Sequence, residues 1–420
     1  MNEQVLNKLK ILAESAKYDV SCSSSGTVRR NKAGMLGNTV GGWGICHSFA
    51  DDGRCISLLK IMLTNYCIYD CAYCVNRRTN DIPRATFSVS ELVELTMEFY
   101  RRNYIEGLFL SSGVVRNADY TMERLVRVAK DLRTVHRFNG YIHLKSIPGA
   151  SRELVNEAGL YADRMSVNIE IPTEENLKRL APEKDHQSVF APMRYIQQGV
   201  LQSAEERKHF RHAPRFVPAG QSTQMIVGAT SETDQDILQL SSALYRRSTM
   251  KRVYYSGYIP VNAYDTRLPA LKQPPLVREN RLYQADWLLR YYLFTVDEIV
   301  DSAHPNLSLD FDPKLGWALR HPEYFPVDVN TADYEMLLRG PGIGVKSARL
   351  IVASRRFSRL GTYQLKQMGV VLKRARYFIT CRELPVQTIH ELTPQGIVQL
   401  LAPKKKKSED ERQLCFDFSE

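Results

Sequence analysis

Apolar residues occur in two different patterns along the middle of the chain. Short apolar runs of the kind that form buried strands occur at 56–63, 107–111, 141–145, 164–170, 223–227 and 252–258. Between them, apolar residues recur every three or four positions, which predicts helices over 121–136, 151–158 and 233–247. Ser88 and Glu91 add a capping box ahead of another helix. Strands that alternate with helices in this way predict an α/β domain with a parallel sheet, either doubly wound or a partial (βα)6 barrel.

Composition places the chain among ordinary globular proteins. Its 420 residues are 44% hydrophobic and 25% charged, and no apolar run reaches the roughly 18 residues that a membrane-spanning helix needs. The first residues lack the charged and apolar stretches of a secretory signal, and residues 6–12 have the spacing of a short amphipathic helix. Eight cysteines in a chain of this length fit a reducing compartment better than a disulfide framework. We therefore expect a cytoplasmic protein, which in a bacterium can associate with the nucleoid.

Positive charge is concentrated in one segment. The whole chain has a formal net charge of +11. Residues 327–381 contain ten lysines and arginines against Asp328, Asp333 and Glu335, so this segment alone has an excess of seven positive charges. A concentrated basic patch favours a polyanionic partner, although a solvated basic surface would have the same composition.

Three cysteines follow the first predicted strand: Cys67, Cys71 and Cys74, with the spacing C-x3-C-x2-C. Thiols this close cannot pair into unstrained disulfides, and three of them leave one over, so they favour a shared inorganic centre. A structural zinc ion takes four protein ligands, and a fully protein-bound 4Fe–4S cluster takes four cysteines. Three thiolates on one loop would leave one iron of a cluster open to another ligand. Zinc binding and incidental thiols are the alternatives.

Small and polar residues follow the other predicted strands. In strand order they are Ser111, Ser112 and Gly113, then Lys145, then Asn168 and Glu170, then Val227 and Gly228. Taken singly, each has a structural explanation, such as a turn glycine or a cation at a strand end. The carboxyl ends of parallel strands meet at one edge, where the chemistry of such folds collects. Together with the cysteines, these residues therefore predict a cofactor site.

The cysteine spacing, with Tyr73 before the last cysteine, resembles the signature of radical S-adenosylmethionine (SAM) enzymes. The resemblance implies that Cys67, Cys71 and Cys74 hold a 4Fe–4S cluster, and that SAM binds its open iron. It also implies that one electron from the cluster cleaves SAM to a 5′-deoxyadenosyl radical, which abstracts hydrogen from a substrate.

The same resemblance implies roles for the strand-end residues. Tyr73 would lie against the adenine, and 226–228 with Glu232 are similar to the family's fifth-strand adenine motif. Residues 111–113 stand where the family has Gly-Gly-Glu and lack its carboxylate, so backbone groups or another acid must meet the methionyl amine. The implied SAM contacts are Tyr73, Ser111, Ser112, Gly113, Lys145, Asn168, Glu170, Val227 and Gly228.

Residues 1–55 form an N-terminal extension that is rich in turn-forming residues. It contains Cys22, Cys46, His47 and Cys55, which could hold a second cluster or a zinc ion. Their spacing is irregular and small buried cysteines are common, so ordinary packing is the alternative.

A glycine-rich turn between two helical patterns lies in residues 326–385. Residues 340–344, Gly-Pro-Gly-Ile-Gly, resemble the helix-hairpin-helix motif, a module that holds the DNA backbone without reading its sequence. The glycines let N–H groups at a helix start approach a phosphate. Residues 367–375 resemble a weaker copy that lacks the second glycine, and a hairpin used only for protein packing is the alternative. The predicted DNA-binding residues are Gly340, Gly342, Ile343, Gly344, Lys346, Ser347, Arg349, Lys373 and Arg374.

The remaining segments connect and extend these parts. Residues 56–258 form the predicted barrel, and 259–325 form an aromatic-rich helical bridge that packs on it. Residues 326–385 form the predicted DNA-binding domain, which we expect to be small and all-α. Residues 395–420 have the composition of a flexible tail. Its end, Gln413–Phe418, resembles the short peptides that dock on bacterial replication sliding clamps, and an ordinary amphipathic end would look the same.

As a whole, the chain resembles a bacterial family of radical SAM proteins assigned to DNA modification or repair. The resemblance implies an enzyme that acts on a nucleic acid, expected to be DNA, with an electron donor such as flavodoxin or ferredoxin. A radical SAM enzyme that modifies tRNA or another RNA is one alternative. A DNA-binding protein with a structural or redox-sensing cluster is an alternative from a different class.

Overall fold

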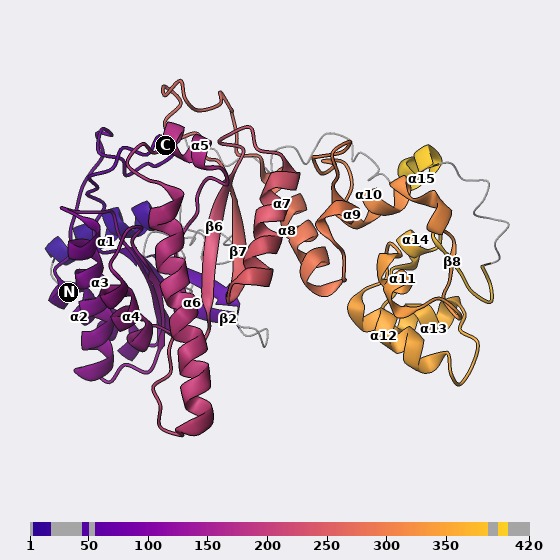
Figure 1. The fold of residues 1–420 in the computed structure, drawn as a ribbon, viewed down its shortest axis with the longest axis horizontal. Helices are drawn as coiled ribbons and strands as arrows, with labels where there is room; N and C mark the ends of the chain where they lie inside the picture. Colours follow the sequence, from indigo (N-terminus) through magenta and orange to yellow (C-terminus); the bar gives the residue numbers. More distant parts are fainter. Residues whose placement is uncertain (1–2, 18–43, 50–54, 385–393, 402–420) are drawn as a thin grey trace, which may run out of the picture. The chain divides into compact units, whose positions relative to one another are not determined.

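The computed structural model describes residues 3–17, 44–49, 55–384 and 394–401 (Figure 1). The chain divides into two compact units, Met1–Tyr283 and Gln284–Glu420, and the division falls inside helix α8 (Leu276–Tyr291). The finer division at residues 55, 258, 325 and 385 stays a prediction. None of the described helices is long and apolar enough to cross a membrane.

The first unit is built on a seven-stranded sheet whose strands follow one another in chain order. Strands β2 to β7 are parallel, as predicted, and β1 pairs with β2 in the antiparallel direction at one edge. The strands are β1 (Ile45–Phe49), β2 (Cys55–Met62), β3 (Gly107–Ser111), β4 (Tyr141–Lys145), β5 (Arg164–Ser166), β6 (Gln221–Val227) and β7 (Met250–Gly257). The predicted α/β class with a parallel sheet is confirmed, in the form of an open half-barrel.

Helices connect the parallel strands, and α2, α3, α4 and α6 pack side by side in that order. The bounds are α1 (Glu3–Ala16), α2 (Val89–Arg101), α3 (Ala118–Thr134), α4 (Arg152–Tyr161), α5 (Glu174–Leu180), α6 (His186–His209) and α7 (Asp234–Arg247). The predicted capping box is present at the start of α2, where Ser88 Oγ accepts from Glu91 N and Glu91 Oε2 accepts from Ser88 N. Crossovers of this kind bring the carboxyl ends of the parallel strands to one edge.

Three parts of the first unit differ from the sequence-based expectation. The fourth predicted strand, 164–170, is regular only over Arg164–Ser166, and its far end turns at Glu170, whose φ is 63°. The connection from β5 to β6 contains α5 and α6, which the pattern did not indicate because α6 is largely polar and mostly exposed or half-buried. Strand β1 was missed because it is a short edge strand beside a glycine-rich stretch.

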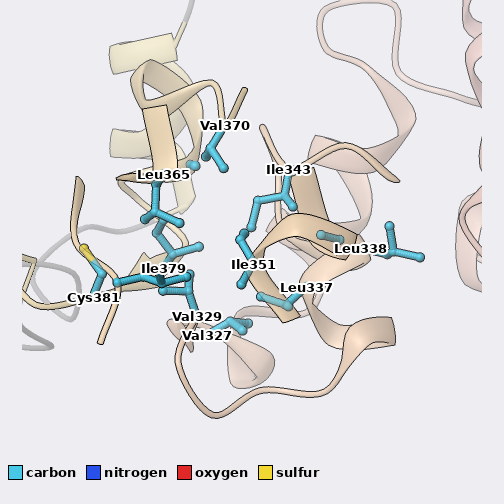
Figure 2. Packing of buried hydrophobic residues seen from close by; sticks show 13 residues of the cluster. Val327, Val329, Leu337, Leu338, Ile343, Ile351, Leu365, Val370, Ile379 and Cys381 are labelled. Carbon is cyan, nitrogen blue, oxygen red and sulfur yellow. The ribbon is translucent and has the colours of Figure 1, made fainter. Parts of the chain in front are cut away.

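The second unit consists of short helices and a two-stranded parallel ladder. In chain order it contains α9 (Val296–Ile299), α10 (Pro313–Arg320), the 3-10 helix Pro322–Tyr324, β8 (Val327–Asp328), α11 (Tyr334–Arg339), α12 (Val345–Ser354), α13 (Thr362–Gln367), α14 (Leu372–Ala375), β9 (Ile379–Thr380) and α15 (Pro394–Leu401). Ile343, Ile351, Leu365, Val370 and Ile379 belong to its core, which Figure 2 shows from close by. The pairing of β8 with β9 joins both ends of this segment, so it is not all helical as expected, and residues of α11, α12, α13 and α14 share one core.

Candidate functional site

The three motif cysteines line one cavity of about 170 Å³ in the first unit. The cavity lies at the carboxyl edge of the sheet, where the loops after β2, β3, β4 and β7 meet. It is also lined by six further residues of the predicted SAM site, namely Tyr73, Ser112, Gly113, Lys145, Asn168 and Glu170. The fold therefore brings together residues that are up to 103 positions apart in the sequence, from Cys67 to Glu170.

Ser111, Val227 and Gly228 do not line this cavity, and their predicted role as SAM contacts has no support from it. Ser111 is buried at the end of β3, and the Val227 carbonyl accepts from the Tyr258 N–H at 2.8 Å. Gly228 has a φ of 84°, and a Cβ there would lie 2.9 Å from Pro275 Cγ, so this glycine serves a tight turn. At this strand end it is Ile226 that faces the cavity.

The cysteine loop is held on both sides by backbone hydrogen bonds. Ile68 N donates to Val114 O at 2.8 Å, and Ala72 N donates to Leu180 O at 2.7 Å. Val114 N in turn donates to Cys67 Sγ at 3.4 Å, so the loop after β3 contacts a cysteine sulfur directly.

Gly113 permits this close approach of the two loops. A Cβ at position 113 would overlap the carbonyl oxygen of Tyr66, the residue just before Cys67. Gly113 N also donates to Thr64 O at 2.8 Å. Glycine at this position is therefore required by the backbone contact between the loop after β3 and the cysteine loop.

Asn262, beyond the end of β7, fastens the cysteine loop from the far end of the sheet. Its side chain is fully buried, and its Nδ2 donates to Ala72 O at 2.6 Å and to Cys74 O at 3.0 Å. Its Oδ1 accepts from Asn80 Nδ2 at 2.8 Å. Sequence reasoning missed Asn262, because no local pattern marks a residue that acts across 188 positions.

Arg84 organises the chain after the last cysteine. Its guanidinium donates to the backbone carbonyls of Asn65, Asn76, Arg77 and Asn80. A guanidinium has enough donors in a fixed plane to hold four acceptors at once. The segment that leaves Cys74 is therefore wrapped around Arg84, which the sequence analysis did not single out.

Glu170 holds a strained backbone conformation at the cavity wall. Its φ of 63° is in the left-handed region, which is costly for a residue with a side chain. Two backbone hydrogen bonds to β6 maintain this conformation. Glu170 N donates to Gln224 O at 3.0 Å, and Ile226 N donates to Glu170 O at 2.7 Å. Its carboxylate Oε1 lies 3.8 Å from Lys145 Nζ. A positive and a negative group thus stand together on the cavity wall.

Lys184, between α5 and α6, adds a second positive group. Its Nζ lies 5.9 Å from the ring centres of both Tyr69 and Tyr73. Burial acts to lower the pKa of this ammonium, but the nearby Cys71, Tyr73 and Glu170 outweigh it and raise the pKa well above its usual value. Sequence reasoning missed Lys184 because it lies on a connection rather than at a strand end.

The chemistry of the three thiols fits a metal centre. Burial, followed by the proximity of Cys71 and Cys67, raises the pKa of the Cys74 thiol to about 12. Burial also raises the pKa of Cys71. Thiols in such surroundings become thiolates at neutral pH when a metal binds them.

The geometry of the donors fits a body larger than one ion. Among the described residues, no three His, Cys, Asp or Glu side chains converge closely enough to hold a single metal ion. The three cysteines instead surround a shared cavity, as an iron–sulfur cluster with one thiolate per iron requires. The zinc alternative is therefore less well matched by the cavity than a cluster is.

Three buried polar atoms along the cavity have no hydrogen-bond partner among the described residues. They are the hydroxyl oxygens of Tyr73 and Tyr258 and Oδ1 of Asn76. Buried polar atoms are nearly always satisfied by protein, water or ligand. A polar cofactor beside the cluster position fits this unsatisfied lining.

In the second unit, the two predicted hairpins meet at Gly342. Its φ is 84°, and a Cβ there would lie 2.7 Å from the Val371 carbonyl oxygen. Val371 N donates to Gly342 O at 2.9 Å, which links the turn between α11 and α12 to the turn between α13 and α14. Gly369, with a φ of 83°, supplies the left-handed position of the second turn.

The predicted DNA-binding residues separate into two groups. Lys346, Arg349 and Lys373 are exposed. Ile343 and Ser347 are buried, and Ile343 belongs to the core cluster shown in Figure 2. Arg374 forms an ion pair with Asp312, and Gly340 and Gly344 cap α11 and α12.

Lys314 on α10 is a further cation at the first hairpin. Its side chain is 8% exposed, and its Nζ donates to Ile343 O at 2.5 Å and lies 4.9 Å from the ring centre of Tyr292. Burial lowers the pKa of Lys314 to about 7. It belongs to a segment that the sequence analysis interpreted only as a bridge.

Two predicted features lie wholly or partly outside the described residues. Of the proposed second metal site, Cys46 lies on β1, whereas Cys22 and the side chains of His47 and Cys55 are not described. The segment Gln413–Phe418 is not described either. Both features stay predictions.

Comparison with known proteins finds one family whose model matches part of the first unit. Residues 61–242 match the model of the radical SAM superfamily. No curated protein matches the chain.

Among solved structures, the chain is similar to two structures of HydG, a maturase of [FeFe]-hydrogenase. The first shares 14% identity over 54% of this chain and 48% of that chain, with a TM-score of 0.41. The second, from Carboxydothermus hydrogenoformans, shares 14% identity over 69% and 80%, with a TM-score of 0.32. The chain is also similar to coproporphyrinogen III oxidase (HemN) from Escherichia coli, with 12% identity over 53% and 50% and a TM-score of 0.33.

The match thus spans about half the length of the first HydG structure and of HemN. The family match runs from the end of β2 into α7 and includes the three cysteines that line the cavity. Residues 61–242 match the radical SAM superfamily, whose members are enzymes that use a 4Fe–4S cluster and a reductant to cleave SAM.

Proposed function

We propose that the protein is a radical SAM enzyme that modifies or repairs a nucleic acid, and that this nucleic acid is DNA. The enzymatic part rests on the shared cavity. Its lining contains three thiols, the oppositely charged Lys145 and Glu170, and buried polar atoms that are not hydrogen-bonded to any described residue. The nucleic-acid part is supported by the basic hairpins of the second unit.

In this proposal Cys67, Cys71 and Cys74 are the cluster ligands. The N–H of Val114 donates to Cys67 Sγ, and hydrogen bonds to sulfur are one means by which proteins tune such clusters. Lys184 offsets negative charge at the ligands, and Asn262 fixes the backbone that carries two of them. An electron donor such as flavodoxin or ferredoxin would supply the reductant.

SAM would occupy the rest of the cavity. Its methionyl group has an ammonium and a carboxylate, and the adjacent Glu170 and Lys145 offer the complementary charges. Ser112, Gly113 and Asn168 line the same space and can donate or accept further hydrogen bonds. When bound, the cluster and SAM supply the 5′-deoxyadenosyl radical, and the protein positions it and excludes water.

The second unit would hold the nucleic-acid backbone. Residues 340–382 contain no aspartate or glutamate, and Lys346, Arg349 and Lys373 are exposed there. Gly344 is the N-cap of α12, and the dipole of this helix favours an anion at its N-terminus. Contacts of this kind position a duplex without reading its sequence, and their strength falls steeply with salt.

Cofactor cleavage tests the enzymatic part. The anaerobically reconstituted chain should bind about four irons, the content of a 4Fe–4S cluster. With dithionite and SAM it should release 5′-deoxyadenosine. Cys71→Ala should abolish this release, whereas Cys381→Ala, a buried cysteine of the second unit, should preserve it. A wild-type protein that holds a cluster and does not cleave SAM would instead support a structural or redox-sensing cluster.

Isotope transfer tests the substrate. The reaction is run with SAM deuterated at its 5′ carbon, first with duplex DNA and then with total RNA, and the digested nucleosides are examined by mass spectrometry. The proposal expects deuterium, or a new nucleoside, in the DNA digest. Label confined to RNA would overturn the DNA assignment and favour the RNA-modifying alternative.

A further inference from the structure

We propose that Phe357 stacks on an unpaired nucleobase at the end of a basic track along α12, so that the partner is a duplex with an unpaired segment. This inference rests on the proposed nucleic-acid function and narrows it. It is independent of the cavity chemistry, because every residue that carries it lies in the second unit.

The track is one exposed face of α12 and of the turn that follows it. Its members are Lys346, Arg349, Leu350, Ala353, Arg356 and Phe357, and all six are exposed. Their spacing of three and four residues places them in one stripe along a helix. The backbone stays helical through Arg355, and Phe357 N donates to Ser354 O at 3.1 Å, so the stripe continues to Phe357.

Phe357 is the most exposed large apolar side chain among those that the structure describes. It is 90% exposed, and Tyr363, at the start of α13, is 70% exposed. A single exposed apolar residue needs no explanation, but here the aromatic ring stands beside Arg356 and Arg359, which are also exposed. Aromatic rings and free cations on one surface are the combination by which proteins bind unpaired bases and their phosphates.

The backbone around Phe357 is fixed rather than loose. Leu360 N donates to Asn330 Oδ1 at 2.7 Å, and Arg355 Nη1 donates to Val329 O at 3.2 Å. Both bonds tie the turn to the chain that follows β8. The ring of Phe357 is therefore presented on a rigid support, which lowers the entropy lost when a base stacks on it.

Charge identifies the kind of occupant. No acidic residue occurs from 340 to 382, whereas the same stretch has ten lysines and arginines, so its surface attracts a polyanion. The helical part of the track, from Lys346 to the end of α12 at Ser354, corresponds to about 12 Å, and Phe357 lies in the turn beyond it. At about 3.4 Å per nucleotide of a strand, the unpaired base would lie roughly four nucleotides or more from the phosphate at the hairpin.

Binding of two matched DNA probes tests this inference on the full chain. One probe is a fully paired, fluorescently labelled duplex, and the other is the same duplex with a three-nucleotide bulge. Phe357→Ala should weaken binding of the bulged probe roughly 5- to 100-fold, the worth of one stacked base, and should leave binding of the paired probe within about two-fold. Phe357→Trp should preserve the preference, and the salt dependence should stay unchanged because no charge is altered.

Phe210→Ala is the matched control, because Phe210 is 68% exposed but lies at the end of α6 in the first unit. It should change neither affinity. Unchanged binding of Phe357→Ala to the bulged probe, or equal loss on both probes, would overturn the stacking inference while the nucleic-acid function stands. If the wild-type chain cleaves SAM but binds neither probe, the proposed function itself fails, and a surface for an acidic protein would replace both ideas.

Discussion

Asn262 and Cys74 are 188 residues apart in the sequence, yet the side-chain amide of Asn262 donates to the Cys74 carbonyl oxygen at 3.0 Å. The same nitrogen donates to Ala72 O at 2.6 Å. Asn262, which follows the last strand of the sheet, thus holds the loop that follows the first parallel strand. This loop carries Cys71 and Cys74, the last two cysteines of the motif.

Asn262→Ala should therefore loosen the cysteine loop. The change leaves two carbonyls of a buried loop without their donor, which costs about 1–3 kcal/mol of folding free energy. We expect a lower iron content after reconstitution and a lower free energy of unfolding, measured by iron analysis and denaturant titration. Asn156→Ala on α4, which is half-buried and outside the cavity, should change neither quantity. Equal iron content in the two variants would show that Asn262 is not needed to position the cysteine loop for the cluster.

Gly113→Ala should disturb the same loop from the opposite side. The added Cβ would overlap the Tyr66 carbonyl oxygen, so the backbone before Cys67 must shift, at a cost of about 1–3 kcal/mol. Iron content and 5′-deoxyadenosine release should both fall. Gly316→Ala is the matched control, because its Cβ would be no closer than 3.4 Å to Phe311 and it lies inside α10, where alanine is the better helix former. That variant should be as stable as the wild type or slightly more stable.

The elements that the sequence predicts well are those whose signal is local. Strands β3 and β4 were predicted with their observed bounds, because each is a short apolar run between turn residues. The capping box of α2 and the cysteine spacing are local in the same sense, since they depend on residues within one turn or one loop. The carboxyl-edge position of the cysteines then followed from the alternation of strands and helices.

What escaped prediction depends on the three-dimensional fold. Asn262, Arg84 and Lys184 act on the cysteine loop through tertiary contacts that leave no pattern in their own neighbourhoods. Conversely, Val227 and Gly228 stand at a strand end, where the sequence analysis expected SAM contacts, but they do not line the cavity. Strand-end position therefore identifies some of the cavity residues, but it misses Lys184 on a connection and includes residues that do not line the cavity.

Gly342→Val should separate the two hairpins. The position needs a φ of 84°, and a Cβ would lie 2.7 Å from Val371 O, so we expect a loss of about 2 kcal/mol or more from the second unit. DNA affinity should fall, while release of 5′-deoxyadenosine without a substrate should stay at the wild-type rate. Lys346→Glu tests the effect of charge alone, because Lys346 is exposed and its replacement should leave the thermal stability unaltered. If neither change affects DNA binding, the proposal that the hairpins bind DNA is wrong.

Lys314 should make the stability of the second unit depend on pH. Burial lowers its pKa from 10.5 in the unfolded chain to about 7 in the folded one, so the unfolded state binds more protons between these values. The free energy of unfolding should therefore rise as the pH increases from about 7 towards 10.5, and the burial penalty is fully present below pH 7. The total change is on the order of a few kcal/mol.

Lys314→Met isolates this contribution, since it keeps a long buried side chain on α10 but removes the titrating group. Denaturant unfolding of both proteins from pH 6 to pH 10 gives the difference between them, in which the titrations of all other groups cancel. We expect the methionine variant to be the more stable at pH 6, with an advantage that shrinks as the pH rises, because neutral lysine keeps its bond to Ile343 O. A difference that is constant over this range would mean that Lys314 stays protonated in the folded protein, as a fixed positive charge beneath the first hairpin.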